Sequence, residues 1–402
     1  MSILRLALPA LAVAGAAIAQ NSCSSSKINI QNSGDAEELA NCQTIRGDVI
    51  IADTVTGDIS LNGVSQIQGD LTCDGCANLT SLEADSLTRI GGDFLLNGLT
   101  SVGNLNFPSI QEVGSINWIA LGPGLSSLSF GDTGVTKADS VKIDNTYLTA
   151  LDGINLEQVD EFEIVNNNFL TKVEVQLYNV TKALTLSSNG LNLSASFPNL
   201  EWAFNMTFRN VSEIEFPSLA RVNGSLGFVE GFYSSISAPN LTRLNSGSLT
   251  FVDNKDLTKL SFPQLSFIGG GFTIANNTKL DSIMGFPKVK TVNGAVDFNG
   301  NFTEASLPAL SVVQGGFNAQ SSEVIEGDDG PCTDFQDQKD QGIIRGRFVC
   351  KGEQEKPGSA GTTPTSSGSS PTNSGAAGQV TANALDVMGF SSIVAALLHL
   401  LL

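Results

Sequence analysis

The chain has 402 residues, with 40 Asp or Glu against 21 Lys or Arg, and its formal charge is −19. This acidic balance speaks against a nucleic-acid-binding protein, since such binding relies on basic side chains that neutralise phosphates. The only histidine is His399, close to the end of the chain. Because that segment is expected to be removed, we expect no histidine general base, no Ser-His-Asp triad and no histidine-ligated metal.

Residues 1–19 have the pattern of a secretory signal peptide. A positive charge at Arg5 precedes an apolar run that ends in Ala17-Ile18-Ala19. A basic start, an apolar centre and a small-residue cleavage site are the features of such a peptide. We therefore expect a secreted mature chain that begins at Gln20.

The other end of the chain carries a short apolar tail. Residues 387–402 hold 16 residues, fewer than the roughly 20 apolar residues that a membrane-spanning helix needs. A polar spacer and a run of small residues precede the tail, which is the pattern of a GPI-anchor signal. Asn373 is the preferred attachment site, with Ser374 or Gly375 as alternatives, and residues 374–402 would be the propeptide. A tail-anchored helix is the alternative interpretation.

Residues 357–373 connect the middle of the chain to this tail. The segment is rich in Ser, Thr and Pro. That composition is typical of a disordered and O-glycosylated stalk, which would hold a folded part away from the membrane.

The middle of the chain is a repeat. Each copy has an apolar residue, a second one three residues later, usually a Gly, and a third apolar residue near position seven. The copies begin at residues 42, 64, 87, 110, 135, 156, 177, 200, 219, 241, 265, 289 and 310. These 12 intervals span 268 residues, so the mean period is near 22. A period of this size is typical of solenoid proteins.

Two further sets of residues keep the same period. Phe-Pro or a variant precedes many copies, at residues 107, 197, 216, 238, 262, 286 and 307. An Asn or Asp follows about ten residues after the start of most copies, at residues 53, 74, 97, 145, 166, 189, 210, 253, 276 and 299. We interpret the second set as structural, because Asn at a fixed turn position can satisfy backbone groups of neighbouring coils.

The repeats lack the periodicity of helices and contain short β-branched and apolar runs, such as residues 49–51, 94–96 and 272–274. Such runs predict strands of three to five residues. The sequence therefore predicts an all-β fold, a parallel β-solenoid of about 12 coils, in which coils stack at about 4.8 Å.

Six cysteines fit a disulfide-capped solenoid. They are Cys23, Cys42, Cys73, Cys76, Cys332 and Cys350. A secreted chain favours disulfides, although six cysteines allow 15 pairings. Local pairing would close one cap before the first coil and another after the last, and would leave Cys73 to pair with Cys76. A thioredoxin-like redox motif is disfavoured for this last pair, because it requires a βαβ context.

Nine Asn-x-Ser/Thr sequons predict a heavily N-glycosylated surface. They lie at Asn78, Asn179, Asn192, Asn205, Asn210, Asn223, Asn240, Asn276 and Asn301. Asn210 and Asn276 also belong to the turn series, so burial there would keep them unmodified.

Asp48, Asp70 and Asp93 occupy one position of three successive copies, 22 and 23 residues apart. Stacked carboxylates could bind Ca²⁺ or serve as the acid/base pair of a polysaccharide hydrolase. We favour a Gly-Asp turn that opens each strand, because later copies carry no acid at this position. The same phase makes the tripeptide Arg46-Gly47-Asp48 a turn rather than an adhesion motif. Trp118 and Trp202, like the many phenylalanines, are expected in the core rather than as platforms that stack on sugar rings.

The whole pattern resembles one family, the fungal GPI-anchored cell-wall-organisation proteins, which are related to sporulation-specific wall proteins and contain receptor-L-type repeats. The stretches Leu241-Thr-Arg-Leu244, Leu257-Thr-Lys-Leu260-Ser-Phe-Pro263 and Val289-Lys-Thr-Val292-Asn-Gly294 carry the resemblance best. It implies a right-handed solenoid in two L-type halves, residues 20–190 and 191–356. It also implies residence at the outer leaflet of the plasma membrane and in the wall, and it supplies no catalytic residue, cofactor or metal.

The sequence thus predicts a non-enzymatic, GPI-anchored surface glycoprotein that organises the fungal cell wall. Its expected partners are wall polysaccharides or wall proteins, and the membrane through the GPI lipid. Two alternatives remain open: a β-helix hydrolase or lyase that uses the stacked Asp residues, and an adhesin or receptor for a protein ligand.

Overall fold

The computed structural model describes residues 23–358. The fold is all-β, with 6% helix and 41% strand, and forms a parallel β-solenoid of about 13 turns with a period near 22 residues. The predicted fold class and period are thereby confirmed, and the number of turns is close to the expected 12. The chain divides into two compact units, Met1–Ala220 and Arg221–Leu402. The division into L-type halves near residue 190 stays a prediction.

The first unit contains a principal parallel sheet and shorter sheets beside it. Its principal sheet runs β1-β3-β6-β8-β10-β11-β12-β14-β16, and the shorter sheets are β4-β7-β9 and β13-β15-β17. The elements are β1 (Lys27–Ile30), α2 (Ser33–Glu37), the 3-10 helix η1 (Glu38–Asn41), β2 (Thr44–Ile45), β3 (Asp48–Ile51), β4 (Thr56–Ser60), β5 (Gln66–Ile67), β6 (Leu71–Asp74), β7 (Asn78–Glu83), β8 (Arg89–Asn97), β9 (Asn104–Asn106), β10 (Glu112–Ile119), β11 (Ser140–Asp144), β12 (Gln158–Val165), β13 (Lys172–Glu174), β14 (Asn179–Ser187), β15 (Ser194–Ser196), β16 (Trp202–Arg209) and β17 (Glu213–Glu215).

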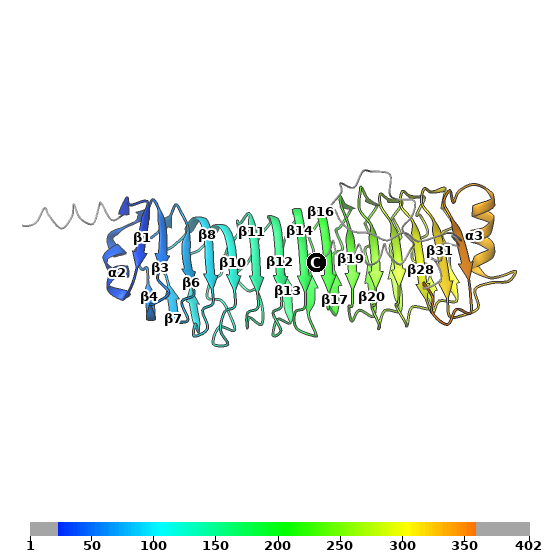
Figure 1. Ribbon diagram of the computed structural model, residues 1–402. Coiled ribbons are helices and arrows are strands. Elements are labelled where there is room, and N and C mark those ends of the chain that lie inside the picture. Colours follow the sequence, from blue (N-terminus) through cyan, green and yellow to red (C-terminus); the bar gives the residue numbers. More distant parts are fainter. Residues whose placement is uncertain (1–22, 359–402) are drawn as a thin grey trace, which may run out of the picture. The chain divides into compact units, whose positions relative to one another are not determined.

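The register of the principal sheet reproduces the sequence period. Val49 pairs with Leu71 and Leu71 pairs with Phe94, which are steps of 22 and 23 residues. All three side chains are fully or almost fully buried. Successive strands of the unit therefore lie side by side, as Figure 1 shows, and each coil places the same apolar position on the same interior column.

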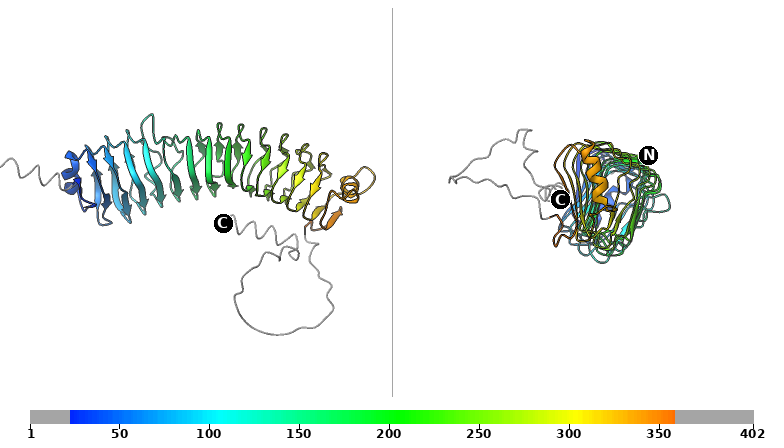
Figure 2. Two further views of the ribbon diagram at one scale, coloured as in Figure 1. Left: turned by 90° about the horizontal axis from the view of Figure 1, so that it is seen from above. Right: turned by 90° about the vertical axis from the view of Figure 1, so that its right-hand side faces the viewer.

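The second unit repeats the arrangement in two parallel series. These are β19-β22-β25-β28-β31-β32 and β18-β21-β24-β27-β30, accompanied by the pairs β20-β23 and β26-β29. Its elements are β18 (Arg221–Val222), β19 (Leu226–Val229), β20 (Ser235–Ser237), β21 (Arg243–Leu244), β22 (Leu249–Val252), β23 (Lys259–Ser261), β24 (Phe267–Ile268), β25 (Phe272–Ala275), β26 (Ser282–Ile283), β27 (Thr291–Val292), β28 (Val296–Gly300), β29 (Glu304–Ala305), β30 (Val312–Val313), β31 (Phe317–Ser321), α3 (Pro331–Asp340) and β32 (Phe348–Lys351). Figure 2 shows these strands from two further sides.

Aromatic side chains fill much of the interior. Phenylalanines of the Phe-Pro series, including Phe197, Phe216 and Phe262, are buried to within 1% exposure. Trp118 is also fully buried and packs edge-on against Phe94, with ring centroids 5.6 Å apart. The expectation for the second tryptophan is wrong, because Trp202 at the start of β16 is only half-buried.

Each end of the described chain is closed by a short helical segment and a disulfide. Cys23 is bonded to Cys42 around β1 and α2, and Cys332 of α3 is bonded to Cys350 of β32. Phe335 of α3 is fully buried, and its ring centroid lies 4.6 Å from that of Phe317. The caps therefore cover interior side chains and sheet edges that a parallel sheet would otherwise leave unpaired.

Candidate functional site

The three stacked aspartates form a hydrogen-bonded column along the first coils. The Asp48 carboxylate accepts from the backbone N–H of Asp70 at 3.1 Å, and the Asp70 carboxylate accepts from the N–H of Asp93 at 2.8 Å. The second unit uses hydroxyls in the same way, since Ser225 Oγ accepts from the N–H of Ser248 at 3.2 Å. The carboxylates of the first unit and the hydroxyl of the second thus make the same hydrogen bond between coils, which is a structural role.

In the other two short motifs, Gly47 and both cysteines are buried. Arg46 and Gly47 lie between β2 and β3, and a Cβ atom on Gly47 would lie 2.2 Å from the backbone of Ser26. Glycine is therefore required for the close approach of two coils. Cys73 and Cys76 are joined by a disulfide, and both are fully buried. Within residues 23–358, no group of three His, Cys, Asp or Glu side chains could hold a metal ion.

The predicted turn series combines three adjacent positions. Asp74, Asn97 and Asn299 lie in strands, one residue before the first of the two turn positions. The first position has a left-handed backbone, as in Asn166 and Asn276 with φ of 57° and 56°. The second position is buried, as in Asn167 and Asn277, which are 0% and 2% exposed. Asn189 belongs to the buried position, so its place in the predicted series is wrong by one residue. Doublets such as Asn-Asn in the sequence are the signal for both positions.

The buried asparagines bind the backbones of neighbouring coils. Asn167 donates from Nδ2 to the carbonyl oxygens of Ile143 and Val165 at 2.9 and 2.8 Å, and its Oδ1 accepts from the N–H of Thr146 at 2.9 Å. Asn189 in turn accepts from the N–H of Asn167 at 3.1 Å. Each amide thus satisfies backbone groups that the turn would leave buried without a partner.

All nine sequon asparagines lie at the surface or are half-buried. Those in the exposed class are Asn78, Asn192, Asn240, Asn276 and Asn301, and the half-buried ones are Asn179, Asn205, Asn210 and Asn223. The burial that would have kept Asn210 and Asn276 unmodified is not present. Use of these sequons stays a prediction.

A polar cleft that the sequence analysis missed lies in the first unit. It has a volume of about 200 Å³, and its polar lining comes from Asp152, Asn155, Lys172, Glu174 and Gln176. These residues belong to two adjacent coils, which a parallel bridge between Ala150 and Lys172 brings together. The repeat pattern does not reveal the cleft, because the residues that line the cleft occupy surface positions that vary from coil to coil.

Charge within the cleft is largely compensated. Lys172 Nζ lies 2.7 Å from the Glu174 carboxylate. The hydrogen bond to Glu174 raises the pKa of Lys172, so the ammonium group stays charged. Asn155 donates to the carbonyl oxygen of Thr133 at 2.7 Å, and Gln176 accepts from Asn199 at 2.9 Å. The cleft therefore offers fixed donors and acceptors with little net charge.

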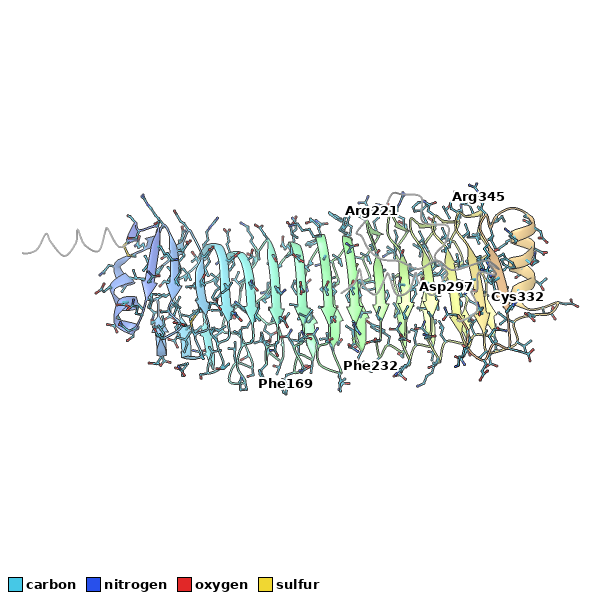
Figure 3. All side chains as sticks on the ribbon, in the orientation of Figure 1. Phe169, Arg221, Phe232, Asp297, Cys332 and Arg345 are labelled. Atoms are coloured by element: carbon cyan, nitrogen blue, oxygen red, sulfur yellow. A yellow bond between two sulfur atoms is a disulfide. The ribbon has the colours of Figure 1, made fainter. Side chains whose placement is uncertain are left out.

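Two exposed aromatic rings stand on the same pair of coils. The ring centroids of Tyr147 and Phe169 lie 5.1 Å apart with 20° between the ring planes. Their exposed fractions are 38% and 53%. Phe169 lies at the outer edge of the ribbon (Figure 3). Sequence reasoning placed the phenylalanines in the core, so these exposed rings are a finding of the structure.

The chain is similar over its full length to fungal surface proteins. It is 40% identical over 408 positions to protein ecm33 of Aspergillus fumigatus, covering 100% of both chains, and 39% identical over 358 residues to a cell surface GPI-anchored protein of Arthroderma benhamiae, covering 89% of both. It is 33% identical to cell wall protein ecm33 of Schizosaccharomyces pombe, covering 81% of this chain and 80% of that one. A family model described as Ecm33, GPI-anchored cell wall organization protein, matches residues 1–40.

The chain belongs to the Ecm33 family. This confirms the resemblance found in the sequence and places the protein among fungal cell-surface and cell-wall proteins with a role in wall organisation. No solved structure matches the chain. The sequence predicts a signal peptide over residues 1–19 and a GPI attachment site at Asn373, Ser374 or Gly375. All of these lie outside the residues that the structure describes. Within residues 23–358, no helix has the length and apolar character needed to cross a membrane.

Proposed function

We propose that this Ecm33-family protein acts without catalysis, as a glycosylated solenoid that is tethered at the cell surface and binds polymers of the wall. The observation that carries the proposal is the similarity, over 89% and 81% of this chain, to proteins named for the cell surface and the cell wall. The aspartate column supports the non-enzymatic part, because the carboxylates of Asp48 and Asp70 already accept backbone hydrogen bonds.

Complementation tests this proposal against the hydrolase alternative. Cells that lack the protein should become hypersensitive to a dye that binds wall glucan or chitin, and the wild-type chain should restore resistance. A chain with Asp48→Asn, Asp70→Asn and Asp93→Asn should restore resistance equally, because the amide oxygens at positions 48 and 70 still accept the backbone hydrogen bonds and Asp93 is exposed. Failure of this triple variant, at normal surface abundance, would support the hydrolase alternative.

A biochemical assay completes the test. The purified protein is incubated with wall glucans, chitin and pectin, and the release of reducing ends is measured. We expect no turnover. Turnover that Asp70→Asn abolishes would contradict the proposal directly.

A separate experiment tests whether the proposed membrane tether is needed. A chain that ends at Gly358 keeps both disulfide-bonded caps but lacks the proposed stalk and anchor signal. We expect this chain to be secreted into the medium and to leave dye sensitivity uncorrected. Restored resistance by the secreted form would show that the wall role does not need an anchor.

A further inference from the structure

The surface of the first unit contains a long stretch without N-glycan acceptors. The sequons stop at Asn78 and resume at Asn179, so residues 79–178 contain none. Both the stacked pair Tyr147–Phe169 and the polar cleft fall inside this stretch. The next coil carries the sequon Asn192, two residues before Ser194, which pairs with Lys172 of the cleft. The residues of the aromatic pair and of the cleft therefore carry no glycan themselves, and the adjoining coil carries the acceptor at Asn192.

Buried neighbours hold the backbone that carries the aromatic pair. Thr146 and Leu148, on either side of Tyr147, are buried, and so is Leu170 beside Phe169. The Thr146 hydroxyl also donates to Asn167 Oδ1 at 2.6 Å. Because the buried neighbours fix the backbone, the two rings present a preformed apolar surface. An aromatic face carries partial negative charge and attracts the weakly positive C–H groups of a sugar ring.

The cleft lies next to this surface along the same two coils. Ala150 and Lys172, which form the bridge at the cleft, each follow an aromatic residue by three positions. Three residues of backbone span at most roughly 10 Å, a separation that a short oligosaccharide can bridge. The volume of about 200 Å³ is below the roughly 300–1,000 Å³ of pockets for drug-sized ligands, so the cleft suits a group the size of one sugar ring.

The charge of the site selects among polymers. Lys172 is paired with Glu174, and Asp152 adds one further acid, so the local charge is close to −1. The chain as a whole carries −19. An anionic polymer would be repelled at this surface, whereas the hydroxyls of a neutral sugar can both donate and accept hydrogen bonds at amide, carboxylate and ammonium groups.

We propose that Tyr147, Phe169 and the adjacent cleft form a binding subsite for a neutral hexose chain. One sugar ring lies against the aromatic pair, and a following unit places its hydroxyls among Asp152, Lys172 and Gln176. The inference rests on the proposed function and names both the site and the ligand chemistry for it.

The test measures oligosaccharide binding to the full mature protein in detergent, by isothermal titration calorimetry. Laminarihexaose and chitohexaose are the two neutral probes and distinguish a glucan source from a chitin source, while a galacturonic acid hexamer is the anionic control. We expect binding to at least one neutral probe. The double change Tyr147→Ala and Phe169→Ala should weaken it at least tenfold, and Asp152→Ala should weaken it several-fold.

Phe232→Ala is the matched control. Phe232 is 40% exposed and lies in the second unit, so its loss removes a similar exposed ring without touching the subsite, and affinity should stay within twofold. Circular dichroism should show unchanged folding in every variant. The proposal is overturned if wild type binds neither neutral probe, if the anionic hexamer binds equally well, or if the aromatic double variant binds like wild type. A chain that restores dye resistance yet binds neither probe would remove the subsite and leave the wall role intact.

Discussion

Single buried amides connect the coils at the residue scale. Asn167 and Asn189 in the first unit, and Asn254 and Asn277 in the second, each bond to the backbone of neighbouring coils. A leucine of similar size could fill the space but could not satisfy these groups. Loss of such an amide leaves several buried donors and acceptors without partners, each of which costs about 1–3 kcal/mol.

We expect Asn167→Ala to lower the free energy of unfolding by about 2–4 kcal/mol, because it takes the acceptor from the Thr146 N–H and removes the amide hydrogen bonds to the Ile143 and Val165 carbonyls. Asn168→Ala is the control, since Asn168 is exposed, and it should change the free energy by less than about 0.5 kcal/mol. Urea denaturation followed by circular dichroism measures both. Equal effects of the two changes would contradict the structural role of the buried position.

A second residue-scale prediction concerns Asp297, which is 6% exposed in β28. Burial raises the pKa of its carboxyl, while hydrogen bonds from Asn318 and Asn299 lower it; the net direction is upward. The folded state therefore favours the protonated acid. This contribution to stability is present below the ordinary pKa and is lost as the pH rises through the raised one.

Asp297→Asn should accordingly stabilise the protein at neutral pH and have little effect in acid. The amide can still accept from Asn318 Nδ2, which donates to Asp297 at 2.7 Å. The measurement is the difference in urea midpoint between variant and wild type across pH 3 to 7. The pH dependence that the other carboxyl groups contribute is common to both proteins and cancels in this difference. A difference that is constant with pH, or one that favours wild type at neutral pH, would refute this account.

At the scale of elements, the caps decide how the solenoid ends. A parallel coil gains its hydrogen bonds from both neighbours, so a terminal coil has only one. The pairing Cys23–Cys42 closes the first coil, and α3 covers the last one through Phe335. The step from Phe317 to Phe348 is 31 residues rather than about 22, because the capping helix is inserted there.

Removal of the first cap should act locally. With Cys23→Ser and Cys42→Ser, we expect a loss of about 3 kcal/mol, the typical value for a loop of this length. Hydrogen exchange should accelerate in β1 and β3 and stay unchanged in β14 and β16, because each coil contacts only its neighbours. Uniform acceleration across the first unit would show that its coils unfold as a single cooperative block instead.

At the scale of the whole molecule, the distribution of sequons separates covered from open surface. Five sequon asparagines are exposed, while four are half-buried. The oligosaccharyltransferase needs an accessible asparagine, so accessibility should govern how fully each site is used where modification follows folding.

We predict higher occupancy at Asn78, Asn192, Asn240, Asn276 and Asn301 than at Asn179, Asn205, Asn210 and Asn223. Deglycosylation in heavy-oxygen water followed by peptide mass spectrometry measures the occupancy of each site. Equal occupancy in the two groups would indicate modification before folding, and any glycan found within residues 79–178 would contradict the open surface on which the proposed subsite depends.

The sequence by itself determined the period, the all-β class, the interior columns and the family. Stacked coils place position i beside position i+22, so one repeated apolar pattern specifies both the strand and its register. Local spacing also favoured the three disulfides that the structure contains. These features follow from residues that every coil must share.

Only the tertiary structure decided what lies between those shared positions. It separated exposed Asn166 from buried Asn167, left Trp202 half-buried, and brought Tyr147 beside Phe169 above a polar cleft. These are differences between coils rather than repeats, and side chains 22 residues apart become neighbours only when the coils stack. The period therefore reveals the scaffold, whereas the candidate binding surface arises from the residues that break the period.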